Sequence, residues 1–276
     1  MRTFLVEGTG TPSVVFLPGA GLTGLDFHNV HRRAAERTTS VRYDRAGTGW
    51  SDPVDLPRTP TQVTDELHGL LHSADVPGPY LLVGHSLGAF YARQFAHRFP
   101  DEVAGLLLLD PGHEDLPAFL PSEAVELNER LKPDLQNLPD LTEEQRAAAR
   151  TQFEQLYAAW PDDLRKELIE HHLTAWRTSI SESANFETEV YAELRGTSLP
   201  DVPLIVLTAT GRNPFWSRFA DEALVERMHL GVRQAQATLA SSVPRGEQRF
   251  VDASHQYLHI EREDAVVAAL DDLLAR

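Results

Sequence analysis

Short β-branched or leucine-rich runs alternate with helical segments along most of the chain, and this alternation most constrains its fold. Six runs are predicted strands, at residues 13–17, 40–43, 80–83, 103–109, 202–208 and 247–251. Most are too apolar for either face to meet water, which is typical of a parallel sheet covered on both sides. Helical periodicity recurs at residues 25–36, 61–74, 87–98, 221–240 and 264–274. This order predicts an α/β fold with a mostly parallel central sheet flanked by helices.

The alternation stops between Pro111 and Pro200, where the sequence has helical periodicity and no strand pattern. We therefore expect a core domain of residues 1–110 and 201–276 and an all-helical cap, or lid, of residues 111–200. The cap has 18 acidic and 8 basic residues, against 23 and 17 in the rest of the chain. It therefore carries most of the net charge of −16.

Composition excludes several classes of function. With 41 acidic and 25 basic residues, the chain lacks the basic surface that nucleic-acid binding requires. The absence of cysteine excludes a disulfide framework, a thiolate zinc site and a cysteine nucleophile. No segment has the pattern of a signal peptide or the length of a membrane span, so we expect a cytoplasmic protein. His113, Glu114 and Asp115 are adjacent and rarely converge on one ion, so neither metal nor cofactor is expected.

Residues 84–88 read Gly-His-Ser-Leu-Gly and match the G-x-S-x-G pattern of a nucleophile elbow. The pattern follows one predicted strand and opens the next predicted helix, which is the strand-turn-helix setting that it needs. Glycines flank the serine because only glycine lets neighbouring backbone pass so close to a sharp turn. We therefore predict that Ser86 is a nucleophile, and that His85 beside it points away and packs.

A serine nucleophile needs a base that takes its proton, and His255 is the best placed of the 12 histidines. It follows the predicted strand 247–251, and loops at the carboxyl ends of parallel strands meet at one edge of the sheet. His259 is the alternative, although it lies in a stretch that approaches a helix.

The base in turn needs an acid that orients it, and Asp110 is the predicted acid. It ends the run 103–109 and gives the chain order Ser, Asp, His that is expected for this architecture. Asp221, Glu114 and Asp115 remain alternative acids.

Two backbone N–H groups are expected to stabilise the oxyanion, those of Leu87 after the nucleophile and Ala20 in the glycine-rich turn 17–21. Aromatic residues in and after the cap are candidates for an apolar substrate pocket, with packing between helices as the alternative for each. They are Phe119, Phe153, Tyr157, Trp160, Trp176, Phe186, Phe215 and Trp216.

Together these residues resemble the α/β-hydrolase superfamily over nearly the whole chain. The resemblance includes residues 43–52, Tyr-Asp-Arg-Ala-Gly-Thr-Gly-Trp-Ser-Asp, which in the family form a turn beneath the site. Within the superfamily the chain is similar to bacterial esterase-like members whose helical lid follows the sixth strand in the family's numbering. It departs from the common pattern in two ways. Pro18 precedes the glycine of the oxyanion turn, where many members have histidine. Asp110 follows the family's sixth strand, whereas many members place the acid after the seventh. Haloalkane dehalogenases share the second feature, but serine at position 86 argues against their chemistry and against epoxide hydrolysis.

The resemblance implies hydrolysis of a carboxylic ester or lactone of a small, moderately apolar substrate through a Ser-His-Asp triad and an acyl-enzyme. One alternative is a thioesterase or acyltransferase that acts on an acyl thioester. Acyl carrier proteins are usually acidic, and a cap of net charge −10 would repel them. The other alternative is a ligand-binding protein on a hydrolase scaffold. The oligomeric state is left open.

Overall fold

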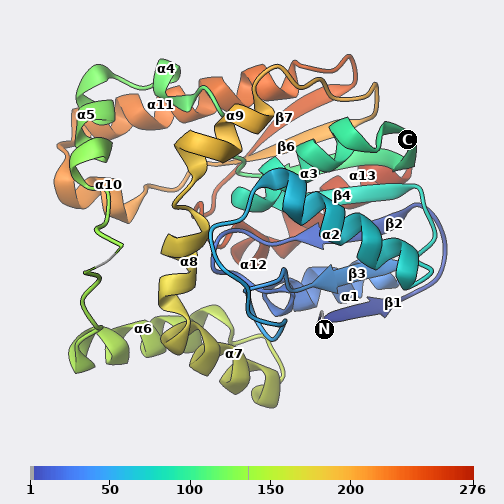
Figure 1. Ribbon diagram of the computed structural model, residues 1–276, viewed down its shortest axis with the longest axis horizontal. Coiled ribbons are helices and arrows are strands. Elements are labelled where there is room, and N and C mark those ends of the chain that lie inside the picture. Colours follow the sequence, from blue (N-terminus) through green and yellow to red (C-terminus); the bar gives the residue numbers. More distant parts are fainter. Residues whose placement is uncertain (1–2, 136) are drawn as a thin grey trace.

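A seven-stranded sheet forms the centre of the computed structural model, which describes residues 3–135 and 137–276 (Figure 1). Its strands lie in the order β1-β3-β2-β4-β5-β6-β7. Their bounds are β1 Phe4–Glu7, β2 Ser13–Leu17, β3 Ser40–Tyr43, β4 Tyr80–His85, β5 Val103–Leu109, β6 Leu204–Ala209 and β7 Gly246–Val251. Neighbouring strands are parallel except β1, which is antiparallel to β3. The predicted fold class is confirmed.

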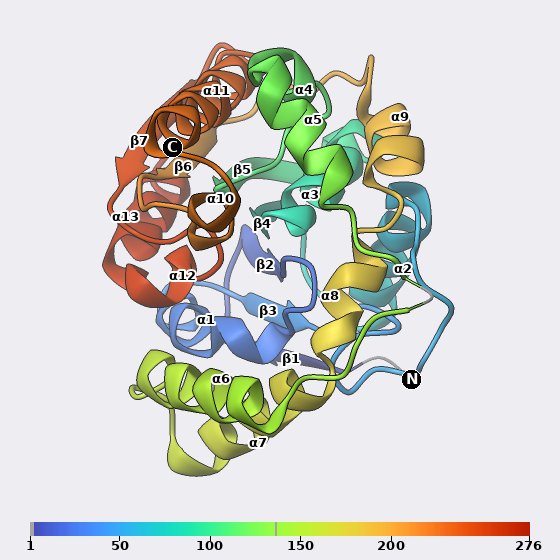
Figure 2. The same ribbon diagram turned by 90° about the vertical axis from the view of Figure 1, so that its left-hand side faces the viewer.

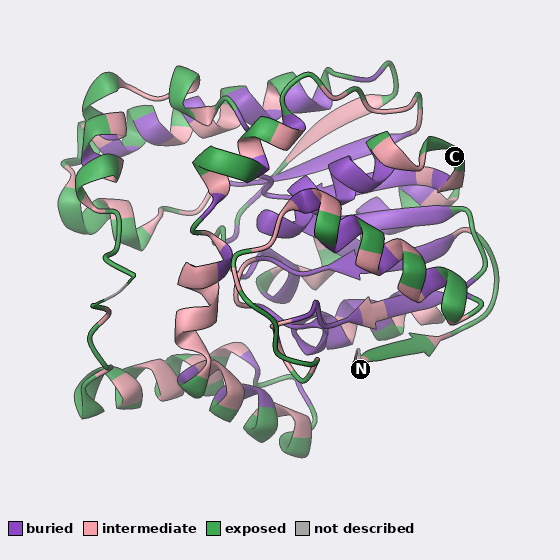
Figure 3. Ribbon diagram, viewed as in Figure 1, coloured by how far each residue is buried: buried purple, intermediate pink, exposed green. Residues whose placement is uncertain are grey.

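Strand β1 is the strand that the sequence did not predict. Phe4, Leu5 and Val6 are 41%, 37% and 38% exposed, and the strand lies at the open edge of the sheet (Figure 3). Its apolar run has only three residues, which is shorter than the runs of four to eight that indicate a strand.

Helices cover both faces of the sheet. α2 (Pro60–Ser73), α3 (Leu87–Arg98) and α11 (Glu222–Ala240) share one buried cluster with it, and α1 (His28–Ala35) and α13 (Glu263–Leu274) share the other. Successive residues of β5 enter opposite clusters, Leu106 and Leu108 the first and Leu107 and Leu109 the second. All four are fully buried, which explains why the run is apolar without alternation.

Between β5 and β6, the described residues form helices joined by loops and contain no strand. They are α4 Leu116–Phe119, α5 Ser122–Arg130, α6 Glu143–Leu156, α7 Asp162–Thr174, α8 Trp176–Glu182, the π-helical turn η3 Phe186–Val190, and α9 Tyr191–Leu194. α4 packs on α11 at one end of the molecule, whereas α6 and α7 pack together at the other (Figures 1 and 2). α8 lies between these two groups, beside the strand ends (Figure 2).

Four short helices complete the fold: η1 Gly24–Phe27, η2 Pro100–Glu102, α10 Pro214–Phe219 and α12 Leu258–Glu261. None of the helices in the described part of the chain has both the length and the apolar character needed to cross a bilayer.

Strand order reverses between β2 and β4, because the chain passes from β2 outward to β3 and then returns to β4. Such a switch point leaves a crevice at the carboxyl edge of a parallel sheet, where ligands bind in folds of this kind. The turn after β2 and the start of α3 are in close contact there. A Cβ atom on Gly88 would lie 2.0 Å from the Leu17 carbonyl oxygen, so this position requires glycine.

Candidate active site

Ser86 lies at the switch point, in the turn between β4 and α3. Its backbone has φ 48° and ψ −113°, a conformation that few residues other than glycine adopt. Backbone strain of this kind is typical of a nucleophile elbow. The neighbouring glycine is also required, since a Cβ atom on Gly84 would lie 2.6 Å from the Cα atom of Ala89.

A chain of hydrogen bonds runs from Ser86 through His255 to Asp110. The Ser86 Oγ lies 3.3 Å from Nε2 of His255, and Nδ1 of His255 lies 2.5 Å from Oδ2 of Asp110. The three residues follow β4, β7 and β5 respectively, so the parallel sheet brings them to one edge. Because Nδ1 faces a carboxylate it carries the imidazole proton, which leaves Nε2 free to accept the serine proton.

The second carboxylate oxygen of Asp110 is held by two further donors. Oδ1 accepts hydrogen bonds from the Ala209 amide at 3.0 Å and from the Gln236 side chain at 2.9 Å. Burial alone would raise the pKa of this carboxyl, but the hydrogen bond and charge of His255, with the two donors, lower it overall. Gln236 comes from the middle of α11, and no sequence motif marked it.

The pKa of His255 is raised above its ordinary value of 6.5. Removal from water lowers this pKa, and the adjacent Asp110 carboxylate more than offsets that effect. The imidazole keeps 47% of its surface exposed. The His255 imidazole is therefore protonated in mildly acidic solution and neutral at higher pH.

His85 has a positioning contact beyond the packing that the sequence suggested. Its Nε2–H donates to the backbone carbonyl of His255 at 2.8 Å. Burial, and then the charge of His255, lower the pKa of His85 to about 4, so the ring is neutral. His259, the alternative base, is stacked on Phe27 with its ring centroid at 4.2 Å, and neither of its buried ring nitrogens has a hydrogen-bond partner among the described residues.

The alternative acids are engaged elsewhere. Asp221 caps the start of α11. Glu114 forms a buried two-pronged ion pair with Arg93, both contacts at 2.7 Å. Asp115 pairs with Arg195 at 3.0 Å. Among the four carboxylates considered, Asp110 is the one that contacts His255.

The two amides expected to bind an oxyanion lie in elements that meet at Ser86. Leu87 is the first residue of α3, and the first N–H groups of a helix have no partner inside it. On the other side, a Cβ atom on Gly19 would lie 3.4 Å from the Cβ of Ser86, so the turn that contains Ala20 passes directly beside the serine.

A buried ion pair holds that turn in place. Arg45 donates to the carbonyls of Pro18 at 2.6 Å and Gly19 at 2.9 Å, and Glu182 accepts from the amide of Gly21 at 2.7 Å. Arg45 and Glu182 also bind each other at 2.9 Å, and the two side chains are 1% and 4% exposed. Glu182 ends α8, so the helical insert contributes directly to the geometry of the turn.

Ser86, Asp110 and His255 line a cavity of about 200 Å³. Two of the predicted pocket residues, Phe186 and Trp216, also line it. The apolar wall of the cavity also contains residues that were not predicted from the sequence, including Phe90, Leu116, Tyr191 and Val232. Its polar lining includes Asn213, His229, Arg233 and Gln236.

The other predicted pocket residues do not line this cavity. Tyr157 and Trp160 fasten α6 and α7 to the core: the Tyr157 hydroxyl donates to Asp26 at 2.5 Å, and the Trp160 indole donates to the Leu25 carbonyl at 3.2 Å. The rest pack elsewhere or face solvent: Phe153 beside Tyr157, Phe119 against His113, Trp176 under Arg177, and Phe215 with 52% exposure. Helical spacing identifies apolar faces but not the surface against which a face packs.

Arg233 stands out in the cavity because its side chain has no polar partner among the described residues. Its Nε is buried without a hydrogen-bond partner, and the side chain forms no ion pair with any residue in 3–135 or 137–276. Burial, and then the charge of Arg233, lower the pKa of neighbouring His229. The cavity therefore combines an apolar wall with one cation.

The fold and this arrangement have the features of a hydrolase built on a parallel sheet. The sequence pattern of the "Alpha/beta hydrolase family" matches residues 14–269, and the chain belongs to that family. It is 34% identical over 113 residues to the uncharacterized protein YqjL of Bacillus subtilis, an alignment that covers 41% of this chain and 45% of YqjL. The chain thus spans less than half the length of that curated relative.

Solved structures share the fold over almost the entire chain. A thermophilic esterase from Thermogutta terrifontis superimposes with a TM-score of 0.64 at 18% identity, covering 99% of this chain and 93% of that one. The enol-lactonase from Burkholderia xenovorans LB400 superimposes with a TM-score of 0.62 at 18% identity, covering 100% and 96%. At such identities the likeness concerns the fold alone.

Proposed function

We propose that the protein is a serine hydrolase that cleaves a carboxylic ester or lactone through Ser86, His255 and Asp110. The observation that carries the proposal is the hydrogen-bond chain between these residues, which opens into a cavity with an apolar wall. Structural likeness to an esterase and an enol-lactonase supports the same class of substrate. We also assign residues 111–200 as the cap, since Leu116, Phe186 and Tyr191 of this segment line the cavity.

The first half-reaction forms an acyl-enzyme. The Ser86 oxygen attacks the carbonyl carbon while its proton passes to Nε2 of His255, and Asp110 stabilises the imidazolium that results. The carbonyl oxygen becomes an oxyanion that accepts hydrogen bonds from the amides of Ala20 and Leu87. As the intermediate collapses, the bond to the alkoxy oxygen breaks and His255 returns the proton to it. An alcohol leaves, or in a lactone the ring opens.

The second half-reaction releases the acid. Water attacks the acyl carbon and gives a proton to Nε2 of His255, and the same two amides stabilise the second oxyanion. The bond to Ser86 then breaks, the serine oxygen recovers the proton, and the carboxylic acid departs.

Parallel assays of esters and thioesters test the class of reaction. We expect turnover of p-nitrophenyl esters of increasing chain length and of a γ-lactone, and little or none of matched acyl-coenzyme A thioesters. Turnover of thioesters alone would show that the protein is a thioesterase and would refute the proposal. No turnover of any of these substrates, together with no labelling of Ser86 by a fluorophosphonate, would indicate a binding protein.

We further infer that the substrate carries a carboxylate or another anionic group. Arg233 lines the cavity with a buried, unpartnered Nε, and burying polar groups without partners is costly unless a ligand supplies them. The whole protein has net charge −16, so a local cation offsets the field that an anionic substrate meets.

Hydrolysis of mono-p-nitrophenyl glutarate and of the uncharged p-nitrophenyl valerate tests this inference. In Arg233→Met we expect KM to rise about 10- to 100-fold for the glutarate alone, since hydrogen bonds to charged groups contribute about 1.5–3 kcal/mol. Arg218→Met is the control, because Arg218 lies over Phe219 outside the cavity. Equal changes in KM for both esters would refute the assignment of Arg233.

A further inference from the structure

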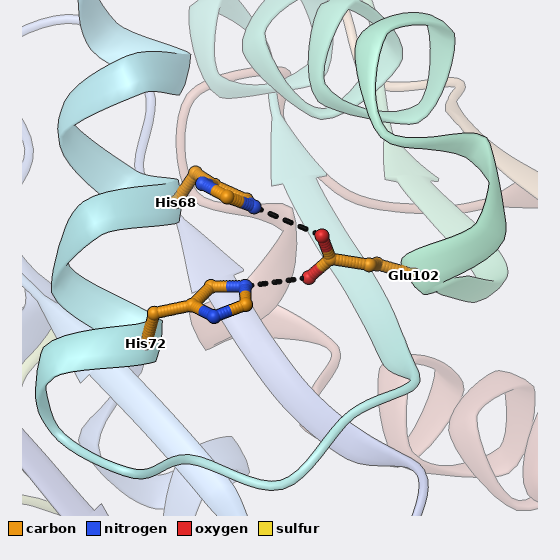
Figure 4. A group of neighbouring side chains, drawn as sticks. All are labelled: His68, His72 and Glu102. Atoms are coloured by element: carbon orange, nitrogen blue, oxygen red, sulfur yellow. Dashed lines mark hydrogen bonds and ion pairs between the residues drawn. The ribbon is translucent and has the colours of Figure 1, made fainter.

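His68, His72 and Glu102 form a cluster far from Ser86, and we propose that it binds a divalent transition metal ion such as Zn²⁺. His68 and His72 lie four residues apart on α2, so they share one face of the helix. Glu102 comes from η2, the turn before β5. Figure 4 shows both imidazoles pointing at this single carboxylate.

The spacing of the ligand atoms suits one ion. Nε2 of His68 is 2.9 Å from one Glu102 oxygen, and Nε2 of His72 is 2.9 Å from the other. All three groups offer ligand atoms within 4.8 Å of one another. Around tetrahedral Zn²⁺, with bonds of about 2.0–2.1 Å, neighbouring ligand atoms are roughly 3.3 Å apart. Small side-chain rotations therefore separate the present arrangement from coordination.

The ligand types also fit. Two imidazoles and one carboxylate make a set that Zn²⁺ uses, with water in the fourth position. Coordination would use the Nε2 lone pair of each ring, with the ring proton on Nδ1. The His68 ring is already fixed, because it stacks on Phe99 with centroids 4.0 Å apart. His72 is 55% exposed, which leaves the ion a route from solvent.

The position of the cluster indicates a structural rather than a catalytic ion. η2 precedes β5, so the cluster lies at the amino edge of the sheet, whereas Ser86 lies at the carboxyl edge. A bound ion would link α2 to the turn before β5 and stabilise the folded chain, because the three ligands come together only when the chain is folded. No metal was expected from the sequence, because the two histidines lie 30 or more positions from Glu102 and no ligand motif joins them.

Calorimetric titration of the tag-free, chelator-treated protein with ZnCl₂ tests the proposal. We expect one equivalent of Zn²⁺ to bind and to raise Tm. In His72→Ala and Glu102→Gln, binding should weaken at least about 10-fold. Loss of a residue that only supports a metal ligand already costs about this much in metal affinity, and these variants remove a ligand itself. His97→Ala is the matched control, since His97 is an exposed helical histidine outside the cluster. No binding by the unaltered protein, or equal binding by all three variants, would overturn the proposal.

Discussion

Asp110 contributes to the proposed mechanism through the orientation of His255. Its Oδ2 contacts Nδ1 of His255 while its other oxygen is fully occupied by Ala209 and Gln236, so the carboxylate has little freedom to move. In this role the negative charge fixes the tautomer of the base and stabilises the imidazolium.

Asp110→Asn should therefore lower kcat for p-nitrophenyl butyrate by about 10⁴-fold, as the equivalent change does in serine proteases. An asparagine of the same shape cannot hold the proton on Nδ1. Asp221→Asn is the control, because Asp221 caps α11, and asparagine is an equally good cap. If Asp221→Asn were the damaging change, the assignment of the acid would be wrong.

The pH dependence of kcat/KM reports on His255 itself. Its neutral form is the proposed base, and its pKa is raised above 6.5 by Asp110. Activity should be full above this raised pKa and should fall as the pH drops through it, with an inflection above pH 6.5. Initial rates with p-nitrophenyl butyrate between pH 5 and 9 measure the profile. An inflection well below 6.5 would mean that another group, or an unpaired His255, controls the rate.

At the scale of elements, α8 is tied to the turn after β2 by the Arg45–Glu182 pair. Removing one partner of a buried ion pair leaves an uncompensated charge, which costs about 3–5 kcal/mol. Glu182→Gln should lower the free energy of unfolding by this amount and reduce kcat, because the turn that contains Ala20 is held by Glu182 through the amide of Gly21 and through Arg45. Urea denaturation and ester turnover measure the two effects.

Glu187→Gln provides the comparison for that substitution. Glu187 pairs with Lys132 on the surface, with the two side chains about half exposed, and such pairs contribute about 0–1 kcal/mol. If the two variants were equally stable and equally active, α8 would have no special role in supporting the turn.

Elements with strong local signals were predictable from the sequence, and those that depend on distant contacts were not. Buried strands, the main helices and the strand-end residues Ser86, Asp110 and His255 each carry a local pattern. β1 carries only a weak one, because its apolar run of three residues is too short to indicate a strand. The contacts of Gln236 with Asp110 and of His85 with the His255 backbone join residues more than 100 positions apart, so only the folded chain brings them together.

The same distinction explains the aromatic residues of the insert. Tyr157 and Trp160 were predicted to line the pocket, with packing between helices as the alternative, because an apolar helical face suits either role. Which surface that face covers depends on how α6 and α7 dock, and they dock on Leu22 and Leu25 rather than over the cavity.

In the whole molecule, the insert contacts the core at two ends and also between them, where Glu182 of α8 meets the turn beside the serine and α9 packs on α3. α4 packs on α11 at one end, and α6 and α7 pack near η1 at the other (Figures 1 and 2). The proposed substrate cavity lies beside the first attachment, where Leu116 meets residues of α11. The insert carries most of the net negative charge of the chain, whereas the lining of this cavity includes a cation, Arg233.

The central claim is that Ser86 is the nucleophile, and kcat of Ser86→Ala on p-nitrophenyl butyrate tests it most directly. Tm of this variant and of the exposed-site control Ser217→Ala should match that of the unaltered protein. We predict that Ser86→Ala loses about 10⁶-fold in kcat, as serine hydrolases do without their nucleophile, and no longer reacts with a fluorophosphonate. Full ester turnover by a folded Ser86→Ala protein would contradict the account.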